Sequence, residues 1–219
     1  MSALLRSSPR TPHSPEPALP GWRAAPALVG VAVLDDHAAV RAGLAAIIGA
    51  APDMAPVGSA SGEQELHWLL ERTDPSVLVV DVHHPGLHGL ALSLRLKHRS
   101  SRPGVVLYSG RGGDLLSVAA AVAGVDAVVS KSDTERALLE AIRQAARPGD
   151  AEPTVTLHAQ GRAAGRIDPA DHGILAMRIA GHSWADIAAT LRLSIATVVD
   201  RGADMVVRLT STGAATLPA

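Results

Sequence analysis

Five short apolar runs separated by amphipathic stretches fill residues 29–148 and limit the folds open to this chain. Continuous apolar runs of this length are typical of strands buried on both faces of a parallel sheet. The stretches between them repeat apolar residues at helical spacing. The pattern predicts an α/β fold, a doubly wound, parallel, five-stranded sheet of flavodoxin-like type with right-handed crossovers. The runs lie at residues 29–34, 55–59, 77–81, 104–109 and 125–130.

The pattern changes after residue 148, where apolar residues keep helical spacing only. Residues 149–166 are rich in Gly, Pro and polar side chains and predict a linker. Residues 167–209 predict a small all-α domain whose helices follow the capping residues Asp168, Ser183 and Ser194. We therefore expect an α/β domain followed by a separate helical domain.

The two ends of the chain predict no packed structure. Residues 1–28 contain six prolines among Ser, Arg and Thr, which predicts a disordered extension, and residues 210–219 predict a frayed tail. No stretch is long and apolar enough to cross a bilayer, and the N-terminus lacks the pattern of a signal peptide. We therefore expect a cytoplasmic protein with no membrane segment.

Composition narrows the kinds of site that the chain can hold. It contains no cysteine, which excludes disulfides, thiol nucleophiles and cysteine-bound zinc. Its formal net charge is −1, so there is no overall attraction to nucleic acid or membrane. Any such attraction has to come from local groups of residues.

Carboxylates follow two of the predicted strands. The first run ends on Asp35 and Asp36, and the third ends on Asp81. In a flavodoxin-like sheet the first and third strands end side by side at the point where ligands bind. Clustered carboxylates repel one another, and a hard cation such as Mg²⁺ relieves that repulsion. The sequence therefore predicts a magnesium site in this crevice.

Two more polar residues end the later strands. Ser109 closes the fourth run and Lys131 follows the fifth, so both are expected to face the same crevice. A lysine and a metal neutralise the charge of a phosphoryl group, a hydroxyl donates a hydrogen bond to it, and a carboxylate attacks it. This set of residues points to phosphoryl transfer.

These residues also carry a resemblance to a known family. Residues 29–148 resemble a response-regulator receiver domain of NarL/FixJ type. The spacing agrees with it, since Asp81 follows Asp36 by 45 positions and precedes Ser109 by 28 and Lys131 by 50. The motifs that carry the resemblance lie at residues 33–37, 40–44, 81–89 and 123–127.

The resemblance implies a role for each residue of the crevice. Asp81 is the aspartate that a sensor histidine kinase phosphorylates. Asp35, Asp36 and Asp81 hold Mg²⁺ together with the backbone carbonyl of His83. Ser109 is the switch hydroxyl, and Lys131 pairs with the phosphoryl group.

The chain departs from this family at three positions. Val128 stands where an aromatic ring usually moves inward when the hydroxyl engages the phosphoryl group. Gly110 and His88 replace a small residue such as alanine and an acidic residue, respectively. A weaker or different switching response is expected.

The C-terminal helices resemble a LuxR-type helix-turn-helix domain over residues 167–209. Gly181 ends the first helix, Ser183 begins the scaffold helix and Ser194 begins the recognition helix, whose early residues enter the major groove in such domains. The family likeness implies that DNA is a partner and that the active form is a homodimer. The expected DNA contacts are Arg192, Ser194, Thr197, Arg201 and Arg208.

Several residues of this segment argue against strong DNA binding. The family often has lysine at the position of Val199 and a polar residue at that of Asp200, where this chain places a carboxylate that repels phosphate. Gly202 inside a helix costs about 1 kcal/mol. Trp184 replaces a small polar residue and either packs or contacts the DNA backbone.

Two functions from different classes fit these observations. The first is a two-component response regulator that controls transcription and is not a conventional enzyme. The second is an interaction module whose C-terminal helices no longer bind DNA and which pairs with other regulators.

Three other readings are weaker. A phosphatase is disfavoured because no second acid lies two residues after a nucleophile. A transition-metal site at His83, His84 and His88 lacks the spacing of a helical zinc site. A generic three-helix bundle stays open for the C-terminal segment.

Overall fold

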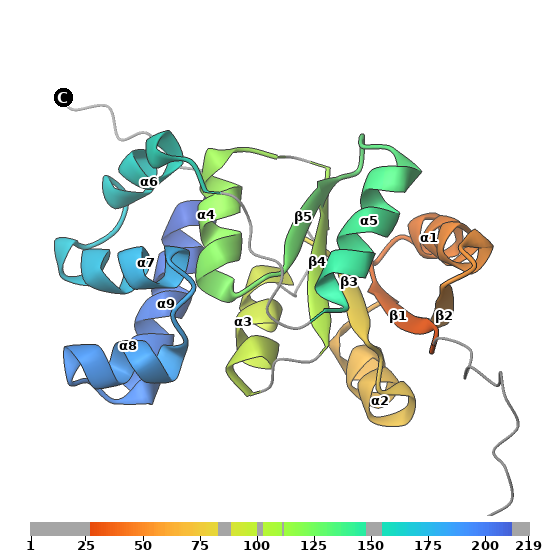
Figure 1. Cartoon of the computed structure of the whole chain (residues 1–219), viewed down its shortest axis with the longest axis horizontal. Helices are drawn as coiled ribbons and strands as arrows, with labels where there is room; N and C mark the ends of the chain where they lie inside the picture. The colour runs from red at the N-terminus through yellow and green to blue at the C-terminus, as the bar shows by residue number, and fades with distance from the viewer. Residues whose placement is uncertain (1–26, 83–88, 100–102, 111, 148–154, 212–219) are drawn as a thin grey trace, which may run out of the picture.

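The described residues form one parallel sheet and the helices around it (Figure 1). The computed structural model describes residues 27–82, 89–99, 103–110, 112–147 and 155–211. The strand order is β2-β1-β3-β4-β5, and every neighbouring pair is parallel. This order confirms the flavodoxin-like α/β fold. The strands are β1 (Val29–Leu34), β2 (Met54–Ala60), β3 (Val77–Asp81), β4 (Gly104–Ser109) and β5 (Ala127–Ser130).

Helices cover both faces of the sheet, as parallel strands require. Side chains alternate along each strand, so that Val31 and Val33 pack on the side of α1 and α5, while Ala32 and Leu34 pack on the side of the other helices. The helices of this part are α1 (Ala38–Ala50), α2 (Glu63–Thr73), α3 (Gly89–Arg99), α4 (Asp114–Ala123) and α5 (Glu135–Ala145).

In the C-terminal part, a 3₁₀ turn and two helices begin directly after the predicted caps Asp168, Ser183 and Ser194. Ser183 and Asp186 form a reciprocal capping box at α8, and the Ser194 hydroxyl accepts a hydrogen bond from the Thr197 N–H at α9. Gly181, two residues after the end of the helix His172–Ile179, has a left-handed φ of 82°. The elements are α6 (Leu157–Ala164), a 3₁₀ turn (Pro169–Asp171), α7 (His172–Ile179), α8 (Trp184–Leu191) and α9 (Ile195–Thr210).

Helix α6 differs from the sequence prediction, because it lies within the 149–166 stretch that was expected to be an irregular linker. The Thr156 hydroxyl caps it by accepting from the Ala159 N–H, and Ala159 and Ala163 are buried. A small-residue face of this kind has little apolar periodicity in sequence, and packing on α4 supplies what the local pattern lacks.

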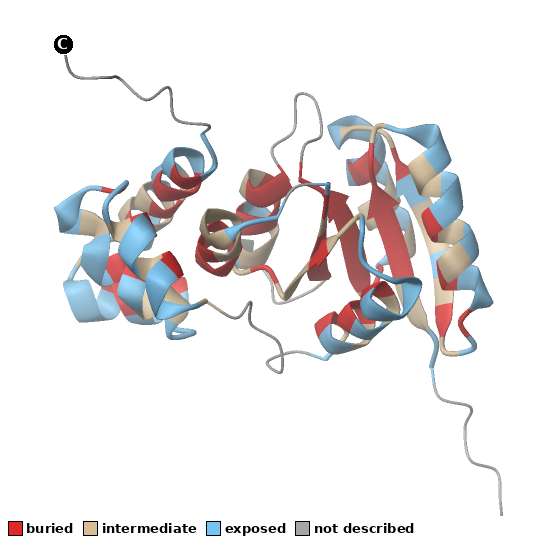
Figure 2. Ribbon diagram, turned by 90° about the horizontal axis from the view of Figure 1, so that it is seen from above, coloured by how far each residue is buried: buried red, intermediate tan, exposed pale blue. Residues whose placement is uncertain are grey.

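The C-terminal helices pack directly against α4 and extend the core of the α/β part. Figures 1 and 2 show α4 between the sheet and these helices, with buried residues on both sides of it. Leu107, Val118 and Met205 are all 0% exposed and belong to one hydrophobic cluster. Residues 1–26 of the predicted extension and residues 212–219 of the predicted tail lie outside the described residues. No helix in the described part is long and apolar enough to cross a membrane.

Candidate functional site: a carboxylate and lysine crevice

Three buried polar side chains stand at the carboxyl ends of neighbouring strands. Asp35 follows β1, Asp81 ends β3 and Ser109 ends β4, and they are 1%, 5% and 1% exposed. Because β1, β3 and β4 are adjacent and parallel, these residues meet at one edge of the sheet. The structure thus brings together three residues that the sequence predicted as one site.

Lys131 joins these residues from the segment after β5. Its Nζ lies 2.9 Å from Asp35 Oδ2 and 3.2 Å from Asp81 Oδ1. Its backbone N–H donates to the Ser109 carbonyl oxygen at 2.7 Å, which fixes where the side chain starts. An ammonium between two buried carboxylates offsets part of the cost of burying them.

This ion pair determines the charge of the site. Burial raises the pKa of Asp35, but hydrogen bonds from Lys131 and from the His37 backbone N–H lower it by more, so that the net pKa lies below its usual value. Burial lowers the pKa of Lys131, while its contacts with Asp35 and Asp81 raise it by more, to a net value above the usual one. Both groups are therefore ionised at neutral pH.

The loop from β1 into α1 presents the two adjacent carboxylates. The His37 N–H donates to Asp35 Oδ1 at 2.8 Å. The Arg41 guanidinium donates to the carbonyl oxygens of Asp35 and Asp36 at 2.8 and 3.1 Å. These two positioning residues were not predicted as part of the site, although they occur in the motifs at 33–37 and 40–44 and lie at the start of α1.

The acidic residues offer a set of ligands that fits a divalent cation. Asp35, Asp36, His37 and Asp81 each place one ligand atom within 4.8 Å of the others. Asp36 Oδ1 is buried and accepts no well-aligned hydrogen bond from the described residues, although His37 Nδ1 lies 2.7 Å away. A buried carboxylate oxygen in need of a partner fits a hard cation such as Mg²⁺.

Gly89 is a further requirement of the site that the sequence did not single out. It begins α3, and a Cβ at this position would lie 2.7 Å from the Asp81 carbonyl oxygen. Only glycine therefore allows α3 to start this close to the end of β3. The remaining predicted ligand, His83, lies outside the described residues, and so do His84 and His88.

Val128, where the sequence departs from the receiver family, lies on β5. Val128 packs in the cluster on the side of α4, while the aromatic ring of Tyr108 packs in the opposite cluster with α1 and α5. The Lys131 ammonium lies 5.5 Å from the Tyr108 ring centroid. Tyr108 therefore faces the wrong side of the sheet to replace a ring at position 128.

The residues predicted to contact DNA are in several different environments. The Ser194 and Thr197 hydroxyls contact each other at 2.7 Å at the start of α9. Arg201 Nη1 lies 3.2 Å from Asp171 Oδ1, so that its charge is paired. Arg192 and Arg208 are exposed. One of the three predicted arginines is therefore neutralised by an ion pair, while the other two face solvent.

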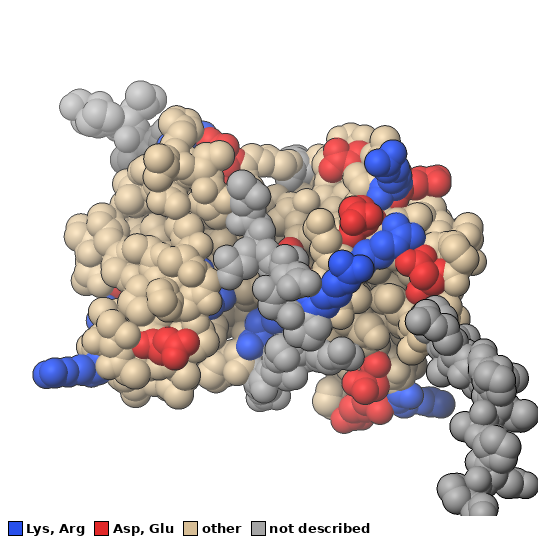
Figure 3. Space-filling model, viewed as in Figure 1, with Lys and Arg blue, Asp and Glu red and all other residues tan. Residues whose placement is uncertain are grey.

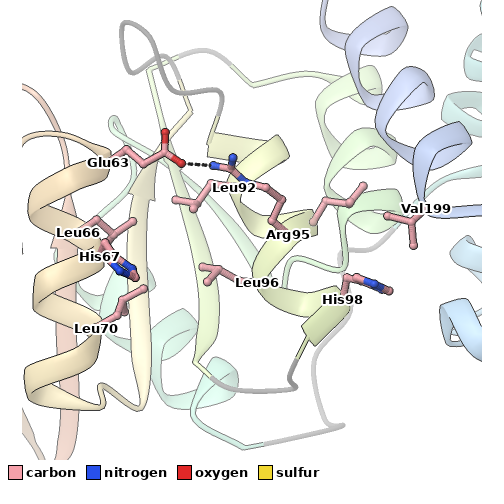
Figure 4. Close-up of a pocket in the computed structure, with 10 residues that line it drawn as sticks. Glu63, Leu66, His67, Leu70, Leu92, Arg95, Leu96, His98 and Val199 are labelled. Carbon is pink, nitrogen blue, oxygen red and sulfur yellow. Dashed lines mark hydrogen bonds and ion pairs between the residues drawn. The ribbon is translucent and has the colours of Figure 1, made fainter. Parts of the chain in front are cut away.

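Helix α9 packs against α4 and α3 of the α/β part. Val199 and Ala203 are partly buried against the main hydrophobic cluster. Val199 also reaches a groove of about 370 Å³ between α2 and α3, whose apolar floor is bridged by the ion pair of Glu63 with Arg95 (Figure 4). On the face seen in Figure 3, Lys and Arg side chains do not gather over the described C-terminal helices.

Trp184 and Gly202, two residues that depart from the helix-turn-helix family, lie against each other. The Trp184 ring packs on α9 where Gly202 leaves room, and a Cβ at position 202 would overlap the ring. Trp184 is only 6% exposed. Of the two alternatives for Trp184, packing is therefore the correct one, and the cost of a helical glycine is offset by this close contact.

Comparison with known proteins agrees with this geometry. The family model described as "Response regulator receiver domain" matches residues 31–143, which is just over half of the chain. The nitrate/nitrite response regulator protein NarL of Escherichia coli strain K12 is 34% identical over 116 residues, or 53% of this chain and 54% of that protein. The transcriptional activator protein ExaE of Pseudomonas putida is 32% identical over 117 residues, with the same coverage. The chain thus spans about half the length of these relatives.

The match extends to enzymes that contain a related segment. The protein-glutamate methylesterase/protein-glutamine glutaminase of Thiobacillus denitrificans is 33% identical over 115 residues, which make up 51% of this chain and 32% of that protein. Similarity in this segment therefore does not by itself determine what the rest of a protein does.

Solved structures share the fold over most of this chain. A LuxR-family two-component response regulator from Aurantimonas covers 71% of this chain and 97% of its own, with a TM-score of 0.53 and 22% identity. RcsB of Salmonella enterica covers 85% and 95%, with a TM-score of 0.53 and 18% identity. At this identity the likeness concerns the fold, including the C-terminal helices. With its crevice residues in place and more than half its length matched, the chain belongs to the response regulator receiver domain family.

Proposed function

We propose that this chain is a cytoplasmic two-component response regulator that a sensor histidine kinase phosphorylates on Asp81. The observation that carries the proposal is the position of the Asp81 carboxylate, 3.2 Å from Lys131 at the end of a buried strand and beside Asp35. Asp35 also contacts Lys131, but it follows the neighbouring strand β1, where its carboxylate suits a metal ligand.

The site residues divide the reaction between them. An Asp81 oxygen bonds to phosphorus while the bond between phosphorus and the kinase histidine nitrogen breaks, and the histidine keeps that electron pair. The Lys131 ammonium contacts Asp81 before the reaction and binds oxygens of the phosphoryl group after it. The Ser109 hydroxyl donates a hydrogen bond to one of them. Asp35, Asp36, Asp81 and the His83 carbonyl would hold Mg²⁺, which supplies positive charge for the phosphoryl oxygens when bound.

The proposed output is regulation of transcription through the C-terminal helices, with an active homodimer and with Arg192, Ser194, Thr197, Arg201 and Arg208 at the DNA. Val199 and Ala203 of α9 are partly buried against the hydrophobic cluster that the C-terminal helices share with the receiver side. The chain catalyses its own phosphorylation in this proposal and is not a conventional enzyme.

The second candidate function is pairing with other regulators without DNA binding. The observation in its favour is the composition of α9, where Val199 and Ala203 are partly buried while Asp200 and Asp204 are exposed. Two exposed carboxylates on a recognition helix oppose binding to phosphates.

Phosphorylation is tested by intact mass after incubation with Mg²⁺ and acetyl phosphate. We expect the wild-type chain to gain one phosphoryl group and Asp81→Asn to gain none. Asp74→Asn, at a left-handed position that asparagine tolerates, serves as the matched control and should behave as wild type. A phosphoryl gain by Asp81→Asn would show that another residue is the acceptor.

The two outputs are separated by DNA binding measured across salt concentrations with the phosphorylated chain. Transcription control predicts an affinity that falls steeply with salt, because each neutralised phosphate releases counterions. Genome-wide DNA capture with the same sample then identifies the sites. Absence of binding by a fully phosphorylated sample supports the pairing function instead.

A further inference from the structure

Tyr108 lies on β4, between the aspartate and the lysine of the crevice. The register of the sheet aligns it with Asp81 on β3 and with Val129 on β5, two positions before Lys131. Lys131 Nζ lies 3.2 Å from Asp81 Oδ1, although β4 separates the strands that carry the two residues. Neighbouring strands are about 4.8 Å apart, so the lysine side chain has to cross the end of β4 to reach Asp81.

The side chains of Asp81 and Tyr108 point to the same face of the sheet. Aligned residues of parallel strands share a face, and side chains alternate along each strand. Tyr108 accordingly packs on the side of α1 and α5, where Val79 and Val106 also lie. The aromatic ring therefore stands beside the path that the Lys131 side chain takes across β4.

The Tyr108 ring faces the charged end of that side chain. Lys131 Nζ lies 5.5 Å from the ring centroid, within the distance of about 6 Å at which a ring face attracts an ammonium group. The three N–H groups of the ammonium point in different directions, and the contacts with Asp35 and Asp81 use two of them. The Lys131 side chain is 26% exposed, and loss of water strengthens the attraction to the ring.

The ring differs from the two carboxylates in one respect that matters for phosphoryl transfer. Phosphorylation turns the Asp81 carboxylate into an acyl phosphate, so Lys131 loses an anionic partner while it turns to the phosphoryl oxygens. The attraction of the Tyr108 ring does not depend on the state of Asp81. Because the lysine stem has four flexible carbons, a partner that stays in place limits the positions of the ammonium during this exchange.

We propose that Tyr108 is a positioning residue of the crevice, whose ring holds the Lys131 ammonium beside Asp81 and thereby speeds phosphorylation. The second half of this statement rests on the proposed function, and the first half does not. Tyr108 acts through Lys131 and not on the phosphoryl group itself. The ring face supplies the attraction, so the phenol hydroxyl is not required.

The contact is tested by NMR of the full chain with isotope-labelled lysine. The chain contains two lysines, Lys97 and Lys131, so each gives its own side-chain signal. The ring current of Tyr108 shifts the signal of the Lys131 methylene group next to the ammonium. We expect Tyr108→Leu to move this signal toward that of a solvated lysine and Tyr108→Phe to leave it nearly unchanged. Lys97, paired with Asp126 before the start of β5, is the internal control and should not move.

The effect on the reaction is tested by the rate of phosphoryl gain with Mg²⁺ and acetyl phosphate, followed by intact mass. We expect Tyr108→Leu to slow the gain about fivefold, as for a partly desolvated cation–π contact, and Tyr108→Phe to stay within about twofold of wild type. Leu139→Ala removes a partly buried side chain of α5 from the same hydrophobic cluster and is the control for lost packing. That variant should keep the wild-type rate.

Each outcome decides one half of the proposal. If the Lys131 signal of Tyr108→Leu equals that of wild type, or if the Lys97 signal moves as far, the ring does not hold the ammonium. If Tyr108→Leu reacts as fast as wild type, or if Leu139→Ala is slowed as much, Tyr108 does not position Lys131 for the reaction. If wild type gains no mass, the proposed function fails together with the second half, and the lysine signals still decide the first.

Discussion

At the scale of single residues, the crevice depends on one lysine between two carboxylates. Lys131 is the only described cation in contact with both Asp35 and Asp81, which are nearly fully buried. The sequence supplied these residues through their positions after strands, but the 2.9 and 3.2 Å contacts come from the fold. The charge balance of the site therefore depends on groups 50 or more positions apart in the chain.

Removing Lys131 should destabilise the protein. We expect Lys131→Met to lower the free energy of unfolding by about 3 kcal/mol, because two buried carboxylates lose their counter-charge. Urea denaturation in the absence of divalent cations measures the change. The double variant Asp35→Asn with Lys131→Met should recover part of the loss, and an equal or larger loss in the double variant contradicts this account.

The lowered pKa of Asp35 predicts a pH dependence with a definite sign. A carboxyl group whose folded-state pKa lies below the unfolded value stabilises the protein at pH values above the unfolded value, near 3.8, and this stabilisation is lost as the pH falls through the folded-state pKa. The difference in unfolding free energy between wild type and Asp35→Asn should therefore shrink as the pH falls from 5 to below 3.8. Denaturation curves of both proteins at several pH values test this, and a constant difference would contradict it.

At the scale of elements, glycines determine how closely helices approach the strands. Gly89 lets α3 start beside Asp81, and Gly104 brings β4 against the Ala145 carbonyl group at the end of α5. A pattern of apolar runs locates these strands but says nothing about such distances. The positions of the strands could therefore be predicted, while the reason for these two glycines could not.

Gly104→Ala should be strongly destabilising, because its Cβ would overlap backbone atoms that cannot move independently. We expect a loss of about 2–3 kcal/mol in the free energy of unfolding. Gly43→Ala is the matched control, since Gly43 lies in the exposed part of α1 with nothing near its missing Cβ. That variant should be as stable as wild type or more stable, by up to about 1 kcal/mol. The measurement compares the urea concentrations at which half of each variant is unfolded. Similar midpoints for Gly104→Ala and Gly43→Ala would contradict the packing at Gly104.

At the scale of the whole molecule, the receiver side and the C-terminal helices share one hydrophobic cluster through α4. We expect Met205→Ala in α9 to lower the stability of the entire chain by about 2–4 kcal/mol, because Met205 is fully buried in that cluster. Val207→Ala, 55% exposed on the same helix, should change it little. Hydrogen exchange of the β-sheet amides measures the effect at a distance from the substitution. Sheet protection that is unaffected by Met205→Ala would mean that the two parts unfold independently.

The sequence alone determined the parallel sheet, the caps Asp168, Ser183 and Ser194 and the order of the five crevice residues, because strand burial, capping and strand-end positions all leave local patterns. It also located the departures at Val128, Trp184 and Gly202. Only the tertiary structure decided that α6 is a helix, that α9 packs on α4, and that Trp184 and Gly202 fit each other. The physical reason is that these features depend on the shapes of surfaces distant in the chain, which the periodicity of one segment does not encode.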